Sequence, residues 1–140
     1  MKFISTKAHG IIDYVYGSFL VLSPFLLRFN NDDMQTFVPV VIGMTVILYS
    51  MFTDYEFGGA KSIPVKTHLI FDLLSAVMLA VSPWLFQFSE SIWRPHLIMG
   101  SLLGTFALAT ETAIRETNAY FERAHRRKLK HAARHRHAIH

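Results

Sequence analysis

Cysteine is absent from all 140 residues, which excludes disulfides and thiolate ligands. The sequence also lacks the G-x4-G-K-[ST], G-x-S-x-G and H-E-x-x-H motifs, so it carries no signature of a P-loop nucleotide site, a serine hydrolase or a zinc protease. Charge is scarce, at 17% of residues, and eight of the fourteen Lys and Arg lie in residues 115–140. Residues 9–114 contain segments that are apolar on every side, which indicates lipid rather than water as the solvent.

Four apolar segments follow one another in this region. Each has roughly 17–20 residues, about the length that a helix needs to cross a hydrocarbon layer of about 30 Å. We therefore predict an all-α fold, an integral membrane four-helix bundle. The predicted spans are Gly10–Phe29, Phe37–Thr53, Leu69–Phe88 and Pro95–Ala113.

The distribution of positive charge predicts the orientation of these spans. If both termini are cytoplasmic, twelve Lys and Arg lie inside and two, Arg28 and Arg94, lie outside. His9 and Asp13 fall where the apolar core of a cleaved signal peptide should be, so we expect an uncleaved first span. The sequence thus predicts a multi-pass protein of the cell (inner) membrane with cytoplasmic N- and C-termini.

An internal repeat is the strongest pattern in the chain. The pattern K-x-H-x3-D-x9-S-P-[FW]-L-x2-F occurs at Lys7–Phe29 and again, 59 residues later, at Lys66–Phe88. In the second half of each repeat the shift is 57 residues, and it aligns Gly43, Thr53 and Asp54 with Gly100, Thr110 and Glu111. We predict two-helix repeats at residues 1–60 and 61–114, followed by a basic cytoplasmic tail at 115–140. An even number of spans per repeat puts the pseudo-twofold axis along the membrane normal.

The two S-P-aromatic segments, Ser23-Pro24-Phe25 and Ser82-Pro83-Trp84, resemble the motif of the SPW repeat family over roughly residues 7–113. The second copy matches the motif literally, whereas the first has Phe25 in place of Trp. The resemblance implies a small membrane protein with two transmembrane helices per repeat, and it implies no particular activity.

Two His–Asp pairs are the main candidates for chemistry. The spacing of four places each His one helical turn from its Asp, and the repeat puts both pairs at the same depth. Asp54 and Glu111 end the second and fourth spans at that level. The candidate polar cluster within the membrane is therefore His9, Asp13, His68, Asp72, Asp54 and Glu111. Three alternatives remain open: pairing between helices, proton or ion handling, and a bound metal held by His9, Asp13, His68 and Asp72.

The Ser-Pro pairs predict helix kinks deeper in the membrane. Each proline removes a hydrogen bond to the carbonyl four residues earlier, and the neighbouring serine can satisfy the freed carbonyl. The residues concerned are Ser23 and Pro24, whose freed carbonyl is that of Leu20, and Ser82 and Pro83, whose freed carbonyl is that of Leu79.

The tail after residue 122 is rich in Arg, Lys and His, and we expect it to bind anionic lipid heads and to continue the fourth span as a helix. No nucleic acid binding is expected and no cofactor is indicated. The leading hypothesis is a non-enzymatic membrane protein that acts through structure or interaction, by self-association or by serving a partner. The alternatives are a small ion- or proton-coupled carrier and a protein that binds a metal or redox cofactor at the His–Asp cluster.

Overall fold

The computed structural model describes residues 6–30, 33–54, 59–60 and 62–137, and their side chains except those of 6, 33, 111–114, 116–117 and 130–137. These residues form four helices: α1 (Thr6–Leu26), α2 (Asp33–Phe52), α3 (Val65–Leu85) and α4 (Arg94–His137). The only extended pairing in the part described is an isolated backbone bridge between Thr53 and Ile63. The prediction of an all-α fold is confirmed.

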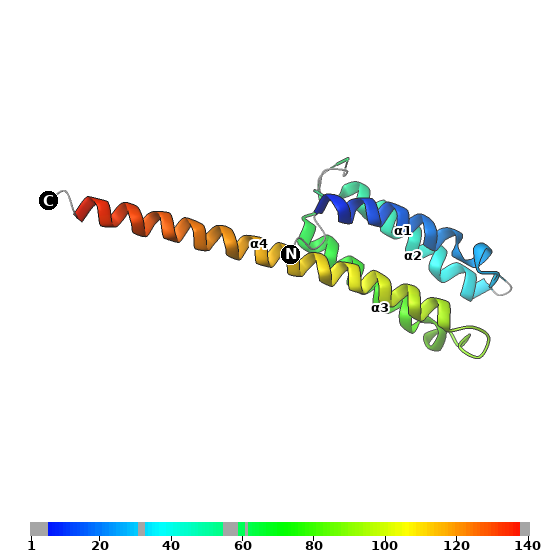
Figure 1. Cartoon of the computed structure of the whole chain (residues 1–140). Helices are drawn as coiled ribbons and strands as arrows, with labels where there is room; N and C mark the ends of the chain where they lie inside the picture. Colours follow the sequence, from blue (N-terminus) through cyan, green and yellow to red (C-terminus); the bar gives the residue numbers. More distant parts are fainter. Residues whose placement is uncertain (1–5, 31–32, 55–58, 61, 138–140) are drawn as a thin grey trace.

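The helices form two hairpins, α1 with α2 and α3 with α4, which lie side by side (Figure 1). Glycine brings the helices of each hairpin into backbone contact. A Cβ added at Gly43 would lie 2.6 Å from the carbonyl oxygen of Gly17, and one added at Gly100 would lie 2.6 Å from that of Ala76. Only residues without a side chain allow this approach, which is common where helices associate in lipid.

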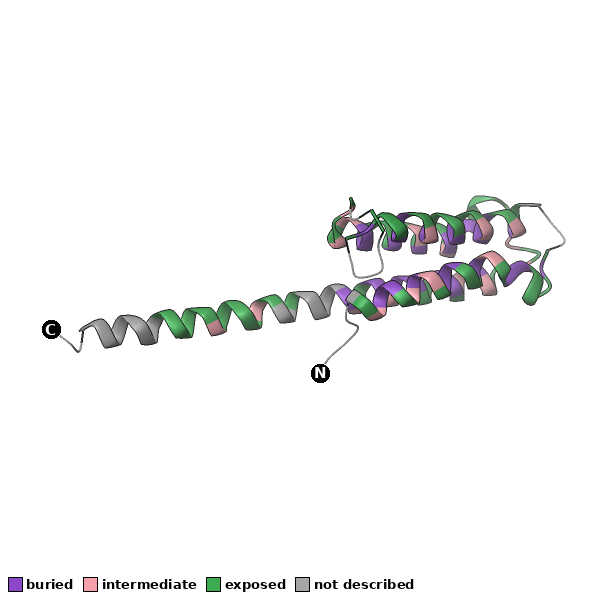
Figure 2. Cartoon of the chain, turned by 90° about the horizontal axis from the view of Figure 1, so that it is seen from above, coloured by how far each residue is buried: buried purple, intermediate pink, exposed green. Residues whose placement is uncertain are grey.

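The buried residues lie where the two hairpins face each other, whereas the outer faces of all four helices are exposed (Figure 2). Leu20, Val46, Leu79 and Leu103 are at most 2% exposed and form the middle of this interior. Polar residues are buried toward both ends of it, so the chain does not follow the rule of apolar inside and polar outside.

The Ser-Pro pairs lie in the last turns of α1 and α3. The backbone N–H of Phe29 donates to the carbonyl of Pro24, and that of Phe88 donates to Pro83, both at 2.9 Å. The residues before these phenylalanines, Arg28 and Gln87, have φ values of 58° and 61°. This bond pattern with one left-handed residue is a Schellman ending. Because of it, α1 and α3 end three residues before the predicted spans do.

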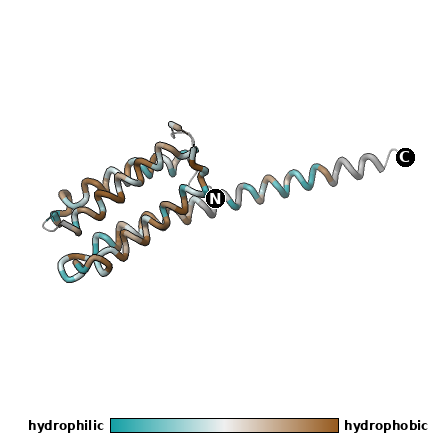
Figure 3. Tube along the Cα trace, turned by 180° about the vertical axis from the view of Figure 1, so that it is seen from behind, coloured by the Kyte–Doolittle hydropathy of each residue, from teal (hydrophilic) through white to brown (hydrophobic). Residues whose placement is uncertain are grey.

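Helix α4 continues far beyond the hairpins, to His137 (Figure 1). Its 44 residues include the predicted basic tail, which is thus helical over its described part. Hydrophobic residues dominate the hairpins, and hydrophilic residues recur along the extension (Figure 3).

Two segments, Met34–Phe52 and Val65–Leu85, are long and apolar enough by themselves to cross a membrane. They lie in α2 and α3, the two middle helices of the chain. Length and composition alone therefore identify half of the four predicted spans.

Candidate functional site

Two histidines and two aspartates meet between the hairpins. His9 and Asp13 come from one face of α1, and His68 and Asp72 come from the matching face of α3. All four are at most 1% exposed. One ligand atom from each lies within 4.8 Å of the ligand atoms of the other three. We call these four residues the His–Asp ring.

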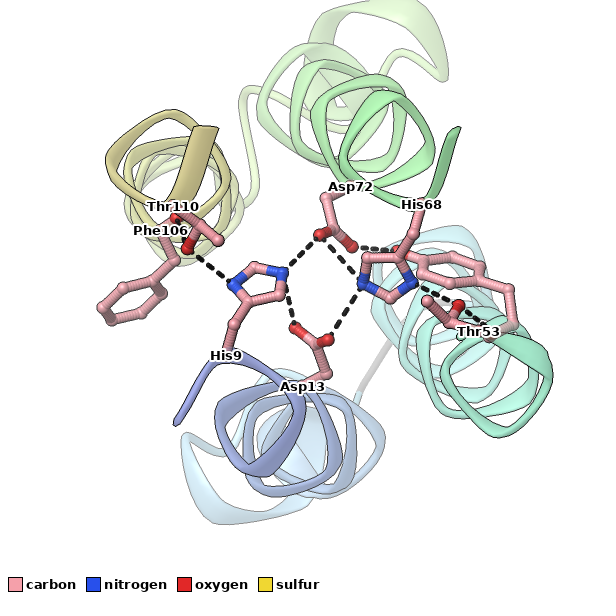
Figure 4. A network of polar contacts seen from close by, with 8 residues as sticks. His9, Asp13, Thr53, His68, Asp72, Phe106 and Thr110 are labelled. Carbon is pink, nitrogen blue, oxygen red and sulfur yellow. Dashed lines mark hydrogen bonds and ion pairs between the residues drawn. The ribbon is translucent and has the colours of Figure 1, made fainter. Parts of the chain in front are cut away.

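The contacts of the His–Asp ring run mainly from one hairpin to the other (Figure 4). The Nε2 atom of His9 lies 3.0 Å from Oδ2 of Asp72, and Nε2 of His68 lies 2.9 Å from Oδ2 of Asp13. Within each helix the corresponding His–Asp distances are 3.5 Å in α1 and 3.2 Å in α3. Each histidine thus faces both carboxylates through a single nitrogen.

A threonine holds the other nitrogen of each histidine (Figure 4). Thr53, the residue directly after α2, lies 2.8 Å from Nδ1 of His68, and Thr110 of α4 lies 3.0 Å from Nδ1 of His9. Each hydroxyl also donates its hydrogen to the carbonyl four residues earlier, at 2.7 Å for Thr53 and 2.9 Å for Thr110. A hydroxyl has one hydrogen, so each threonine oxygen accepts from the histidine.

This arrangement fixes the hydrogen positions on both imidazoles. Because each Nδ1 donates to a threonine, it carries a hydrogen. The Nε2 of a neutral imidazole in that tautomer presents a lone pair, and here both Nε2 atoms face carboxylate oxygens. Two lone-pair-bearing groups at about 3 Å repel each other, so each Nε2 requires either a proton or a cation between it and the carboxylates.

One tyrosine makes the His–Asp ring asymmetric. The hydroxyl of Tyr49 donates to Oδ1 of Asp72, and the Tyr49 ring contacts that of His68 edge-on at 4.9 Å between centroids. At the equivalent repeat position, 57 residues later, stands Phe106, which has no hydroxyl to donate. The two aspartates therefore have different surroundings despite equivalent places in the sequence.

One predicted member, Asp54, does not belong to this ring. The side chain of Asp54 is exposed, and its backbone N–H donates to the carbonyl of Ile63. Thr53 is the residue before it and is fully buried; consecutive residues near a helix end point in directions about 100° apart, so both cannot face the ring. Glu111 lies outside the residues whose side chains the structure describes.

Sequence reasoning missed the threonines and Tyr49. The repeat aligns Thr53 with Thr110. Because charge is costly at membrane depth, the prediction included the carboxylates that follow them and not the threonines. The signal for the threonines was this alignment. Tyr49 gave no such signal, because its repeat partner is Phe106.

The two serines next to the prolines satisfy the carbonyls that the prolines free. Ser23 Oγ donates to the Leu20 carbonyl, and Ser82 Oγ donates to the Leu79 carbonyl, both at 2.8 Å. Both serines are fully buried. Since the prolines lie in the last helical turns, these bonds stabilise the helix ends rather than a bend in mid-span.

A second buried histidine site lies at the opposite end of the hairpins. Pro39 inside α2 frees the carbonyl of Gln35, four residues earlier, and Nε2 of His96 in α4 donates to that carbonyl at 3.0 Å. His96 is fully buried, and its ring contacts those of Phe29 and Phe88, with 5.2 and 4.9 Å between ring centroids. An imidazole from one hairpin thus donates to a carbonyl of the other hairpin that has lost its helical hydrogen bond to a proline.

A comparison with models of known protein families gives a match. The sequence model of a family described as SPW repeat domain matches residues 7–110, a range that contains the His–Asp ring, both Ser-Pro pairs and His96. Comparisons with curated proteins and with solved structures found no match. The matched range covers most of the chain, and it confirms the resemblance seen in the S-P-aromatic segments. The chain is a membrane protein that belongs to the SPW repeat family.

Proposed function

We propose first that all four helices cross the membrane. The outward faces support this, because they are apolar even on α1, whose buried face carries charge. The exposed positions of α1 include Ile11 at 48%, Val15 at 66% and Leu22 at 53%. In water this surface would be an aggregation hazard, whereas in lipid it is the expected exterior. His9 and Asp13 lie on the buried face of α1, so lipid does not contact them.

The same proposal places the two ends of the hairpins at the two membrane surfaces. Trp84 and Trp93 are exposed, at 53% and 40%, and their rings lie 6.1 Å apart at the end remote from the tail. Indole rings prefer the interface. Helix α3 has 21 residues, and at about 1.5 Å per residue it spans about 31 Å, close to the hydrocarbon thickness. The excess of Lys and Arg at the other end supports cytoplasmic termini in the inner membrane.

Within this bundle, the His–Asp ring binds one divalent transition metal ion. The observation that carries the proposal is the pair of threonine bonds, which point both Nε2 atoms at the two carboxylates. Histidines that bind metals usually donate their other ring nitrogen to a fixed partner in this way. Two imidazoles and two carboxylates form a complete ligand set for Zn²⁺ and its neighbours in the first transition row, and nitrogen ligands disfavour Mg²⁺ and Ca²⁺.

Charge balance supports the same proposal. Two neutral imidazoles and two carboxylates carry a charge of −2, which is very costly away from water. One divalent ion cancels it. The four Nε2···O distances of 2.9–3.5 Å are also near the separation of about 3.3 Å between ligands that lie about 2.0 Å from a tetrahedral ion.

Metal titration of the purified protein in detergent tests this function. Five histidines of the tail would bind metal on their own account, so the experiment uses a background in which His125, His131, His135, His137 and His140 are glutamine. Co²⁺ is the probe, because its visible absorption reports tetrahedral nitrogen and oxygen ligands. We expect one Co²⁺ per chain, displaced by Zn²⁺, and loss of that site in Asp13→Asn with Asp72→Asn.

Asp54→Asn is the matched control, because it removes a carboxylate at the exposed end of the same region. It should bind metal as the parent does. If the parent protein is folded and binds no metal, the metal proposal is wrong and the second candidate holds. In that candidate, two protons balance the charge, and the ring is a clasp that joins the hairpins of a structural or ion-coupled protein. The two contacts between the hairpins favour this candidate, because at 3.0 and 2.9 Å they have the length of hydrogen bonds and are shorter than the separation of about 3.3 Å between ligands of a tetrahedral ion. Proton-driven ion flux in liposomes then separates a carrier from a structural protein.

A further inference from the structure

A groove on the outer face between α3 and α4 combines an apolar floor with two cations. Its volume is about 300 Å³, at the small end of the range for ligand sites. Leu69 and Ala107 are buried at its base, and Ile70 and Leu108 are exposed along its walls. The groove does not include the His–Asp ring, so it offers a separate site.

Charge is confined to one end of the groove. Lys66 lies in the first turn of α3, and Arg115 follows the apolar part of α4; both line the groove and both are exposed. Asn118, one turn beyond Arg115, adds an amide that can donate hydrogen bonds. From Lys66 to Leu73 the groove runs along α3 for about 10 Å into the apolar region. One end therefore suits an anion and the remainder suits hydrocarbon.

We propose that this groove binds one anionic phospholipid, with its phosphate at Lys66 and Arg115 and an acyl chain over Leu69, Leu73 and Leu108. Charge complementarity and position favour this occupant. The two cations lie where α3 enters the apolar region and α4 leaves it, which is the level of lipid phosphates in the spanning arrangement. The inner leaflet is rich in anionic lipids, and an adjacent cation contributes about 1 kcal/mol of attraction.

The first hairpin provides a control within the same chain. Lys7 is the repeat counterpart of Lys66, is exposed and likewise lies in the first turn of its helix, α1, but it does not line this groove. Removing Lys7 together with Arg127 of the tail changes the net charge as much as removing Lys66 with Arg115. A difference between the two pairs therefore reports the groove and not the overall charge.

The test is native mass spectrometry of protein extracted from vesicles of equal phosphatidylglycerol and phosphatidylcholine. We expect the wild type to retain one phosphatidylglycerol. Lys66→Gln with Arg115→Gln should weaken retention about tenfold or more, because two cations are lost. Lys7→Gln with Arg127→Gln should retain lipid as the wild type does. Ile70→Trp, which fills the groove without altering charge, should also reduce retention.

Three results would overturn the proposal. Equal loss in both double variants would mean that diffuse positive charge attracts the lipid. Unaltered retention in Ile70→Trp, with competition by inorganic phosphate, would mean an anion site without an acyl chain. A lipid-free dimer that Ile70→Trp dissociates would make the groove a contact between copies of the chain. Circular dichroism of each variant confirms that the helices remain.

Discussion

At the scale of single residues, the orientation of the two histidines depends on two uncharged residues, Thr53 and Thr110. Thr53 and Thr110 each donate to the carbonyl four residues earlier and accept from a histidine of the other hairpin. The histidines thereby keep one tautomer and one orientation. A metal site in such a ring depends on the hydroxyls as much as on its ligands.

Replacing both threonines tests this dependence. Thr53→Val with Thr110→Val keeps the shape of the side chains but leaves both Nδ1–H groups without an acceptor. We expect Co²⁺ affinity to fall about 10–100-fold while the stoichiometry stays at one. Thr45→Val is the control, because Thr45 bonds only the Val41 carbonyl in the same manner on the exposed side of α2. An unchanged affinity in the double variant would show that the hydroxyls do not orient the ligands.

At the scale of the helices, packing within each hairpin depends on glycine. Gly100 faces the backbone of α3, where an added Cβ would lie 2.6 Å from the Ala76 oxygen and 2.7 Å from the Ala80 nitrogen. A backbone cannot give way as a flexible side chain can. At Gly104 the nearest atom is the Ala76 Cβ at 3.4 Å, an ordinary contact.

These two glycines predict opposite effects of the same substitution. Gly100→Ala should lower the free energy of unfolding by about 1–3 kcal/mol, because the hairpin must separate to admit the methyl group. Gly104→Ala should leave stability unchanged or raise it slightly, because alanine favours the helix. Unfolding monitored by circular dichroism in detergent measures both. Equal stability of the two variants would contradict the close packing of α3 on α4.

Much of this arrangement follows from the sequence, and the rest depends on three-dimensional packing. Spacing of four and the repeat predict that His9, Asp13, His68 and Asp72 share a level. They do not predict that each His pairs with the Asp of the other hairpin, because that depends on how the hairpins face each other. The sequence also predicts Asp54 as a member of the cluster, but its neighbour Thr53 takes the inward position and Asp54 is exposed. The hydrogen bond from His96 to the Gln35 carbonyl joins residues 61 apart, so no local sequence pattern predicts it.

At the scale of the whole molecule, a metal ion in the His–Asp ring would join the two hairpins. Each hairpin supplies one His and one Asp, so the ion would bridge them as a cross-link does. The ring lies near the end where the chain enters α1 and α3, and α4 leaves this end for its long extension (Figure 1).

Metal binding is therefore expected to stabilise the fold as a unit. At a free concentration of Zn²⁺ about 100 times the dissociation constant, the free energy of unfolding should rise by about 2.7 kcal/mol. Thermal unfolding of the variant without tail histidines, with and without Zn²⁺, measures this change. Asp13→Asn with Asp72→Asn should show no rise. A rise of the same size in that double variant would place the stabilising ion elsewhere.

The pairing of His96 with the Gln35 carbonyl bears on how the two halves can change over time. His96 occupies the repeat position that Pro39 occupies in the first half, so the freed carbonyl and the imidazole that satisfies it lie in different halves. Two copies of the first hairpin would have two freed carbonyls and no imidazole at the position of His96, and two copies of the second would have two such imidazoles and no freed carbonyl at the position of Gln35. The halves have become complementary parts that are no longer interchangeable, and a symmetric dimer of either one would lose a bond that the fused chain keeps.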